Sequence, residues 1–524
     1  MPSVSASREL KVKDQKGGSN QKGTVPRISK STQKASKPIA TQNNARSTAA
    51  GRKRSLETAH DDQTSTTTSG ISKRVKTGSI GSKEPTKLAI INNAPTAKLT
   101  VLVFGGGEMG ELGLGPKKNE ALRPTRNPHL SAFDVVQVAC GGMHTVALTS
   151  DNKIITWGVN DENALGRDTQ WDGKLRDMDA ASEDDEDDED MNPLESTPMQ
   201  IPSDCFPPHI RFVQVAAGDS CSFALTDTGQ VYGWGTFRDS RGDKGFRYNE
   251  RGELVENQAR PIRIQNLQNI TQICCGVDHA LALDIRGNIW AWGCNEQYQF
   301  GRRLIGRASN SLTPNQVRVC RNKAKYIASG SYHCFAVDKD DNVWGWGANN
   351  FGEAGDVETA GDEGAFITPT KLVGLCQKNV LVLDGGAHHS AAVTANGECF
   401  VWGRMMEGQL GIDFTPEQLR DSTLVRCDER NKPRICLRPT IVPTLAHQQV
   451  THVACGLDHT ILIDKPGNAY STGYGFQGQL GLNSSDDVKV FQRITDKRIK
   501  GKLIWAGAGG RFSIVAESAS TSSS

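Results

Sequence analysis

Acidic side chains stand at equivalent places along this chain. Asp219, Asp278 and Asp458 each lie one or two residues after a glycine, in a short stretch that leads into a histidine or its replacement. Glu108 is a fourth acid, in a separate glycine-rich loop. Carboxylates gathered on one face would bind a basic protein, or a partner whose bound phosphates must be displaced. Aspartate is also favoured beside glycine in ordinary turns, so the residues alone leave both interpretations open.

A polar, arginine-rich segment follows Trp234-Gly235. It consists of Thr236, Phe237, Arg238, Asp239, Ser240, Arg241, Gly242 and Asp243. Such a segment is expected to project from the body of the protein as a loop or wedge. The alternative is a sequence repeat that has diverged without acquiring a role.

Three arginines occur together in a second segment, Arg302, Arg303 and Arg307. Guanidinium groups bind carboxylates and phosphates through paired hydrogen bonds, so these residues are suited to an anionic surface. A solvated basic loop without a partner explains the same residues equally well.

Enzymatic chemistry has no motif in the sequence. The phosphate loop Gly-x-x-x-x-Gly-Lys-Ser/Thr, the metal-binding His-Glu-x-x-His helix and the Gly-x-Ser-x-Gly elbow are all missing. The 13 cysteines are scattered without a Cys-x-x-Cys pair, which predicts small core residues in a reducing compartment. We therefore expect no covalent catalysis, no metal and no cofactor.

An internal repeat must position all of these side chains. A glycine that stands three residues before a histidine, or before its replacement, recurs at Gly141, Gly218, Gly276, Gly330, Gly386, Gly456 and Gly509. A turn, an aromatic-Gly or equivalent pair and usually a Gly-x-Leu-Gly tail follow these glycines, except the last. Apolar residues alternate on both sides of the turn, which indicates β-strands. Small β units cannot bury their own faces, so the repeat predicts an all-β, seven-bladed propeller.

The ends of the repeat region predict how the ring closes. Residues 99–115 hold only the back half of a unit, and residues 502–516 hold only the front half. Joined, they make one composite blade and hide edge strands, so we expect the propeller at residues 99–516. Side chains that recur in every blade are expected to be scaffold, among them His144, His279, His333, His389 and His459.

Charge divides the chain into two regions. Residues 1–99 carry 19 Lys and Arg against 6 Asp and Glu, a net +13, so the overall charge of +2 leaves −11 for the rest. Residues 1–98 are polar and nearly free of aromatics, so we expect them to be disordered, as we do residues 517–524. Two clusters in this tail are typical of nuclear-import signals or of non-specific contacts to nucleic-acid phosphates: Arg52, Lys53, Arg54 and Lys73, Arg74, Lys76. A solvated tail without a partner is the alternative.

An acidic run at residues 183–190 lies in the longest step between two anchor glycines. It predicts a solvated loop insertion at about residues 168–200, and a decoy for the basic tail is the alternative role. The sequence has no long apolar stretch and no signal-like start, so we expect neither secretion nor a membrane span.

Over about residues 99–516, the repeats resemble those of the regulator of chromosome condensation family. The Gly-x-x-His, Trp-Gly and Gly-Gln-Leu-Gly elements recur in order, the last of them at residues 408–411 and 478–481. Three strings are similar to the nuclear exchange factor within that family: residues 141–145, 160–168 and 234–239.

The resemblance implies a chromatin-bound guanine nucleotide exchange factor for the small GTPase Ran, which acts in nucleocytoplasmic transport and mitosis. One propeller face and the wedge would loosen GDP and its magnesium without covalent chemistry. The positions that match the family's exchange-critical residues are Asp219, Asp278, Glu108, His144 and one of the pair His388 and His389. Phe512 and Cys221 depart from the pattern, because each replaces an anchor histidine.

The resemblance also implies two further partners and a nuclear location. The nucleosome would be bound without sequence specificity, through the basic tail and Arg302, Arg303 and Arg307, and a nuclear import receptor would bind the tail. The competing interpretation is a propeller adaptor without exchange activity, such as a ubiquitin-ligase component. A tryptophan-based light sensor is a third, but the tryptophans mostly stand in the repeated Trp-Gly element, which favours packing.

Overall fold

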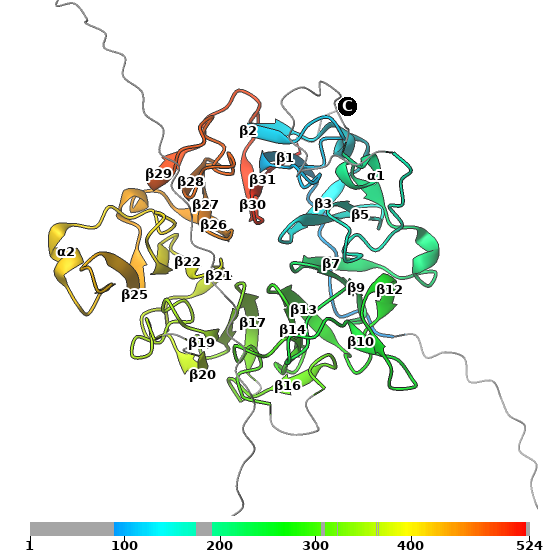
Figure 1. Cartoon of the computed structure of the whole chain (residues 1–524), viewed down its shortest axis with the longest axis horizontal. Coiled ribbons are helices and arrows are strands. Elements are labelled where there is room, and N and C mark those ends of the chain that lie inside the picture. Colours follow the sequence, from blue (N-terminus) through cyan, green and yellow to red (C-terminus); the bar gives the residue numbers. More distant parts are fainter. Residues whose placement is uncertain are drawn as a thin grey trace, which may run out of the picture. The chain divides into compact units, whose positions relative to one another are not determined.

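Antiparallel β-sheets make up almost all of the described chain. The structure is a computed structural model, and it describes residues 88–173, 191–304, 310–321, 323–362, 364 and 366–519. Within these residues, seven sheets of four or five strands are arranged as blades around a central channel (Figure 1). The predicted seven-bladed propeller is confirmed.

Each blade has an inner strand, a second strand, a third strand and an outer strand. The inner strands are β3 (Val135–Cys140), β7 (Phe212–Ala217), β13 (Ile270–Cys275), β17 (Ala324–Ser329), β21 (Val380–Gly385), β26 (Val450–Cys455) and β30 (Leu503–Ala508). The second strands are β4 (His144–Thr149), β8 (Cys221–Thr226), β14 (His279–Asp284), β18 (His333–Asp338), β22 (His389–Thr394), β27 (His459–Asp464) and β31 (Phe512–Ser518). The third strands are β5 (Ile154–Gly158), β9 (Val231–Gly235), β15 (Ile289–Gly293), β19 (Val343–Ala348), β23 (Cys399–Arg404), β28 (Ala469–Gly473) and β1 (Leu99–Gly106).

The outer strands vary most in length. They are β6 (Met199–Gln200), β12 (Gln258–Arg263), β16 (Asn315–Val317), β20 (Phe366–Lys371), β25 (Pro433–Ile441), β29 (Val488–Arg493) and β2 (Glu120–Arg126). Strand β24 (Val425–Cys427) adds to the blade of β25, and β10 (Arg247–Tyr248) pairs with β11 (Leu254–Val255). The short helices are α1 (Pro193–Ser196), α2 (Pro416–Arg420) and the 3-10 turns Pro128–Ala132, Ser203–Cys205 and Pro443–Leu445. None of the helices in the described residues has the length and apolarity needed to cross a membrane.

The first and last strands of the propeller close the ring as predicted. Strand β1 pairs with β31 from Leu99–Ser518 to Gly105–Phe512, and the sheet order is β2-β1-β31-β30. The composite blade thus contains both ends of the repeat region, so neither end is left as an open sheet edge.

Tryptophans join neighbouring blades. Trp157 is fully buried, and its Nε1 donates to the carbonyl oxygen of Glu111 in the preceding blade's tail, at 3.0 Å. Trp234, Trp346 and Trp402 make the same bond to Ala164, Gln299 and Glu353. Each of these four rings therefore fills an interface and also satisfies its polar N–H, whereas Trp292 is buried in the same way but its Nε1 has no hydrogen-bond partner among the described residues.

The anchor histidines join blades in the same way, and their predicted scaffold role is confirmed. All five are buried, and each ring Nε2 lies 2.7–3.1 Å from a hydroxyl or thiol of the next blade. The pairs are His144–Ser222, His279–Cys334, His333–Ser390, His389–Thr460 and His459–Ser513.

Residues before the first strand already contact the propeller. The backbone N–H groups of Ile91 and Asn92 donate to Asp227 O at 2.8 and 3.0 Å, and Asn92 Nδ2 donates to Ile270 O at 2.8 Å. At the other end, β31 runs to Ser518, and Ala519 N donates to Lys98 O. Ordered contacts therefore extend beyond the expected boundaries at residues 99 and 516.

Candidate functional site

One end of the propeller carries the turns between inner and second strands, and we call it the tip face. Its seven tips are residues 141–143, 218–220, 276–278, 330–332, 386–388, 456–458 and 509–511. Backbone hydrogen bonds connect successive tips around the channel mouth, such as Gly142 N to Gly218 O and Asp219 N to Val277 O. The tips therefore form a rigid ring from which side chains project.

The glycine of each Trp-Gly element holds the tip above it. Gly293 has φ +104°, and a Cβ there would lie 2.3 Å from the carbonyl oxygen of Asp278. The next residue, Cys294, donates its N–H to that same oxygen at 2.7 Å. Only glycine combines this conformation with such a close approach, so the Trp-Gly element fixes where Asp278 stands.

Asp219 and Asp278 form a pair of neighbouring acids on adjacent tips. Asp219 is exposed and Asp278 is half-buried. Burial and, next, the negative charge of Asp219 raise the pKa of Asp278 to about 6. Although its side chain is exposed, partial loss of hydration on the tip ring also raises the pKa of Asp219, opposed by the positive charge of Arg238. Neither acid has an ion pair in the described part of the chain. A bound cation would therefore stabilise the negative charges of this pair.

The predicted wedge is a short, braced projection beside this pair. Phe237 is fully buried in a stack with Phe223 and Phe246, each at 5.7 Å between ring centroids. Asp239 is also buried, and it binds Arg241 Nη2 at 3.0 Å.

Only part of the wedge can touch a partner. Of the eight residues assigned to it, Arg238, Arg241 and Asp243 are exposed, whereas Thr236, Phe237 and Asp239 are buried. The expectation that all eight contact a partner is therefore corrected: the buried three anchor the segment. Ser240 N bonds Ser311 Oγ at 3.0 Å, and Lys244 pairs with Glu162, so both neighbouring blades hold the wedge in place.

The structure separates the candidate histidines. His144 and His389 are buried and bound to the next blade, so they cannot contact a partner, and that expectation is corrected. His388 is half-buried on its tip, with Nδ1 3.3 Å from Glu353 Oε1. Its ring lies between Phe351 at 4.8 Å and Tyr332 at 6.4 Å. Of the two consecutive histidines, His388 is the one on the surface.

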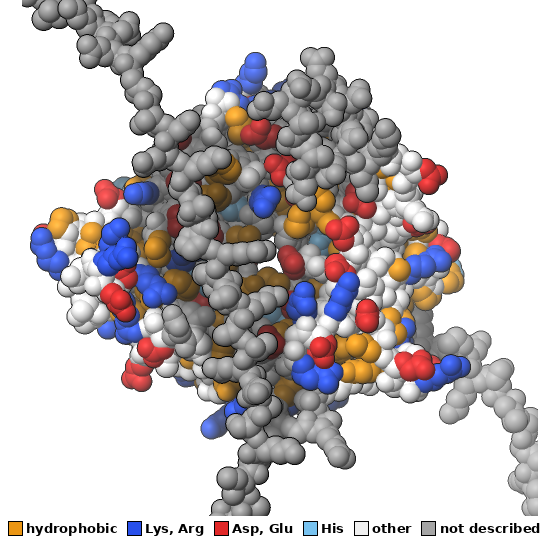
Figure 2. Space-filling model, viewed as in Figure 1, with side chains coloured by type: hydrophobic (Ala, Val, Ile, Leu, Met, Phe, Trp, Pro, Cys, Tyr) orange, Lys and Arg blue, Asp and Glu red, His pale blue; other side chains and the backbone are white. Residues whose placement is uncertain are grey.

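Two other acids of the tip face are paired. Asp458 Oδ1 binds Arg404 Nη1 at 3.0 Å, and Glu108 Oε2 lies 3.6 Å from Arg511 Nη1. At these two blades the carboxylate has a guanidinium beside it, so the acids of the tip face differ in how far they are already neutralised. Figure 2 shows one face of the propeller, with acidic, basic and hydrophobic side chains side by side around the central opening.

Sequence reasoning missed several residues of this face. Arg404 ends a third strand, and Glu353 replaces the glutamine of the Gly-Gln-Leu-Gly tail. Leu457, Tyr474 and Phe476 are exposed apolar residues around a cavity beside Arg511. Glu353 was detectable as a break in the repeat, whereas Arg404 is recognised only from its tertiary contacts with Asp458, Glu407 and the ring of Phe351.

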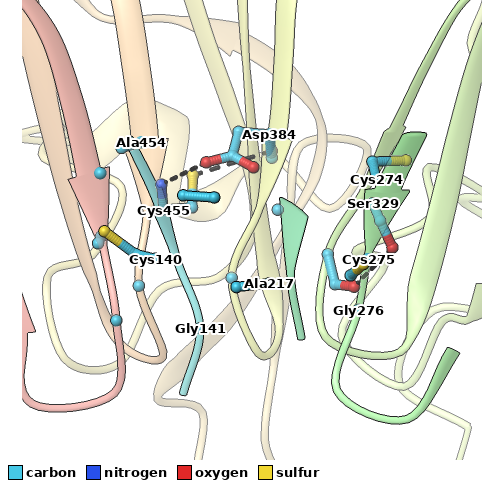
Figure 3. Close-up of a pocket in the computed structure, with 18 of the residues that line it drawn as sticks. Cys140, Gly141, Ala217, Cys274, Cys275, Gly276, Ser329, Asp384, Ala454 and Cys455 are labelled. Carbon is cyan, nitrogen blue, oxygen red and sulfur yellow. Dashed lines mark hydrogen bonds between the residues drawn. The ribbon is translucent and has the colours of Figure 1, made fainter. Parts of the chain in front are cut away.

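The central channel is a second cavity, of about 340 Å³, lined by the inner strands (Figure 3). Asp384 lies in it beside Cys455, whose backbone N–H donates to Asp384 Oδ2 at 2.8 Å. Burial raises the pKa of Asp384 to about 7 and raises the pKa of the Cys274 thiol. In the residues that the structure describes, no cluster of three or more His, Cys, Asp or Glu side chains could hold a metal ion.

The remaining predicted contacts are only partly visible. Arg302 and Arg303 are exposed at the start of their segment, where Asn295 Nδ2 donates to Arg302 O at 3.0 Å. Arg307, the basic clusters Arg52–Arg54 and Lys73–Lys76, and the acidic run 183–190 lie outside the described residues.

Known proteins match most of this chain. The family model for the RCC1-like domain matches residues 100–515. Guanine nucleotide exchange factor SRM1 of Saccharomyces cerevisiae is 37% identical over 433 residues, which cover 79% of this chain and 86% of that protein.

Two solved structures agree with this match. The crystal structure of Prp20p from Saccharomyces cerevisiae, described with its binding properties to Gsp1p and histones, is 34% identical. It has a TM-score of 0.71 and covers 82% of this chain and 94% of that one. Yeast RCC1 (Prp20) bound to Kap60 is 33% identical, with a TM-score of 0.71 and coverage of 85% and 96%.

Proposed function

This chain belongs to the regulator of chromosome condensation family, and from that premise we propose that it is a guanine nucleotide exchange factor for Ran, bound to chromatin. One relative is named a guanine nucleotide exchange factor, and the structure of Prp20p is described with its binding properties to Gsp1p and histones. Exchange requires only that the protein bind the nucleotide-free GTPase more tightly than the nucleotide-bound form. By linkage it then weakens nucleotide binding by the same factor, each tenfold being about 1.4 kcal/mol.

The observation that supports an exchange site here is the pair Asp219 and Asp278. Two adjacent acids with raised pKa values have no ion pair in the described residues, and the braced wedge stands beside them. A GTPase exposes cationic groups when its nucleotide phosphates and Mg²⁺ leave. Carboxylates stabilise those groups and repel phosphate, so they favour the nucleotide-free state. No step of this mechanism makes or breaks a covalent bond.

Chromatin attachment is assigned to the opposite face and the basic tail. Residues 91–92 bond to the end of β8 and the start of β13, which lie at the end of the blades away from the tips. Exposed Lys497, Lys500 and Lys502 lie in the loop that leads into β30, at the same end. Non-specific contacts of this kind bind DNA phosphates and release counterions. A GTPase on the tip face would then leave the chromatin contacts free.

A nuclear location and an import receptor follow as parts of the same proposal. Yeast RCC1 (Prp20) is described bound to Kap60. The clusters Arg52–Arg54 and Lys73–Lys76 are the segments of this chain suited to such a receptor. Arg302, Arg303 and Arg307 are assigned to an acidic histone surface, a contact separate from the lysines of the opposite face, because this part of the chain follows the tip-face end of β15.

The exchange function is tested by release of labelled GDP from Ran in the presence of the full chain. We expect strong acceleration, and at least a tenfold lower kcat/KM for Asp278→Asn. Asp340→Asn is the matched control, because Asp340 lies in the turn between β18 and β19 on the opposite face, paired with Lys323 at 3.0 Å. A wild-type protein that does not accelerate release would favour the adaptor interpretation.

A further inference from the structure

The tail of a blade places one buried side chain against the tip of the next blade. This residue is the x of Gly-x-Leu-Gly or its equivalent, and its side-chain oxygen accepts the backbone N–H of the residue two positions earlier. The bond forms at Glu111, Gln299, Glu353, Gln409 and Gln479, with distances of 2.6–3.0 Å. One polar atom of each side chain is therefore committed to its own loop.

The second polar atom differs between glutamine and glutamate. Glutamine offers an amide NH₂, which only donates, and glutamate offers a carboxylate oxygen, which only accepts. Gln409 Nε2 lies 3.3 Å from Asp458 Oδ1 on the following tip. Glu353 Oε1 lies 3.3 Å from His388 Nδ1 on the following tip. At both interfaces the tail residue complements the tip residue: the Gln409 amide can donate to the Asp458 carboxylate, and the Glu353 carboxylate can accept from the His388 ring.

Glu353 is held rigidly on its side of the interface. It has no exposed surface, and its Oε2 accepts the N–H of Phe351 at 2.6 Å. Its carbonyl oxygen accepts Trp402 Nε1 at 3.0 Å and Ser390 Oγ at 2.9 Å. Because both β22 and β23 hold its backbone, Oε1 can only point at the tip that carries His388.

We infer that Glu353 is a positioning residue that keeps a proton on His388 Nδ1, so that Nε2 faces a bound GTPase as a hydrogen-bond acceptor. The tautomer of a neutral histidine is set by the bond that its other nitrogen makes. The ring centroids of Phe351 and Tyr332 lie 4.8 and 6.4 Å from that of the imidazole, so these neighbouring rings also restrict its orientation. The role in exchange rests on the function proposed above, whereas the tautomer itself does not.

Glutamine at position 353 would reverse this arrangement. Its Oε1 would keep the bond to Phe351 N, as in the three glutamine blades, and its NH₂ would face His388 Nδ1. Nδ1 would then accept, the proton would move to Nε2, and the tip would present a donor in place of an acceptor. The side chain keeps its size, so the change is electronic and not steric.

The test is Glu353→Gln in the full chain, read by two measurements. The first is the ¹⁵N chemical shifts of the ring nitrogens in histidine-labelled protein, with the His388 signals assigned by their loss in His388→Asn. The second is GDP release from Ran. The matched control is Glu111→Gln, because Glu111 occupies the same tail position but the corresponding tip carries Met143, whose side chain has no N–H.

We expect Glu353→Gln to move the His388 proton from Nδ1 to Nε2 and to lower kcat/KM for exchange about tenfold, with Glu111→Gln unchanged in both. An unchanged tautomer in Glu353→Gln would overturn the inference, and so would a changed tautomer with wild-type exchange. Wild-type protein without exchange activity would instead refute the proposed function and leave the tautomer result standing. A urea midpoint of Glu353→Gln equal to that of the wild-type protein excludes a general folding defect as the cause.

Discussion

Replacement of Asp384 by asparagine is expected to stabilise the propeller at neutral and alkaline pH. Asp384 is an acidic residue on inner strand β21, and it lines the central channel. The equivalent residues of the other inner strands are small: Ala139, Ala216, Cys274, Ala328, Ala454 and Gly507. Burial raises its pKa to about 7, although it accepts a hydrogen bond from Cys455 N. Its charge is therefore a cost to the folded state.

The magnitude follows from the pKa shift. An acid whose pKa rises on folding holds its proton more tightly in the native state, so its ionisation lowers the free energy of unfolding as the pH rises from about 4 to about 7. A shift from 3.8 to about 7 corresponds to about 4 kcal/mol above pH 7. Asp384 is only half-buried on the channel wall, so water screens part of this cost. We expect Asp384→Asn to gain about 2 kcal/mol at pH 8.

Urea unfolding at pH values from 4 to 8 measures this effect. Asparagine keeps an oxygen for the Cys455 N–H and removes the charge, so its advantage should shrink as the pH falls through 7 towards 4. Asp384→Ala matches the residue of four other blades but leaves that N–H without its acceptor, so it should gain about 1 kcal/mol less. An asparagine variant no more stable than wild type at pH 8, or a gap independent of pH, would refute the reasoning.

Three further outcomes follow from the contacts described above. Asp278→Asn should raise the urea midpoint at pH 8, because the pKa of Asp278 is raised to about 6 in the folded protein. The same substitution should slow GDP release. Loss of both stability and exchange would indicate a structural role. His279→Ala should lower the free energy of unfolding by about 2–4 kcal/mol, since buried Ser329 and Cys334 lose their partner; a urea titration checks this. Phe237→Ala removes a buried, stacked ring, which should cost about 3 kcal/mol and expose the wedge to trypsin at Arg241; an unchanged digestion pattern would contradict the anchoring role.

The repeat made the architecture predictable because the same local backbone and packing requirements recur in every blade. A glycine at the tip, an aromatic-Gly pair and a glycine-bounded tail each satisfy a backbone or packing need that every blade shares. The half units at the two ends predicted the β1–β31 closure for the same reason. The repeat did not predict how far the ordered ends extend, since residues 91 and 92 are held by carbonyl groups of the turn after β8 and of strands β8 and β13.

The composition and order of residues by themselves determined the propeller, the scaffold histidines and the family. Tertiary structure alone decided which polar residues are available to a partner. Asp458 and Asp278 have the same place in the repeat, but Arg404, 54 residues away, pairs with Asp458. His388 and His389 are neighbours in sequence, but His388 ends the tip and stays half-buried at the surface, whereas His389 begins the fully buried strand β22. Such outcomes depend on contacts across blade interfaces, between side chains that no local pattern relates.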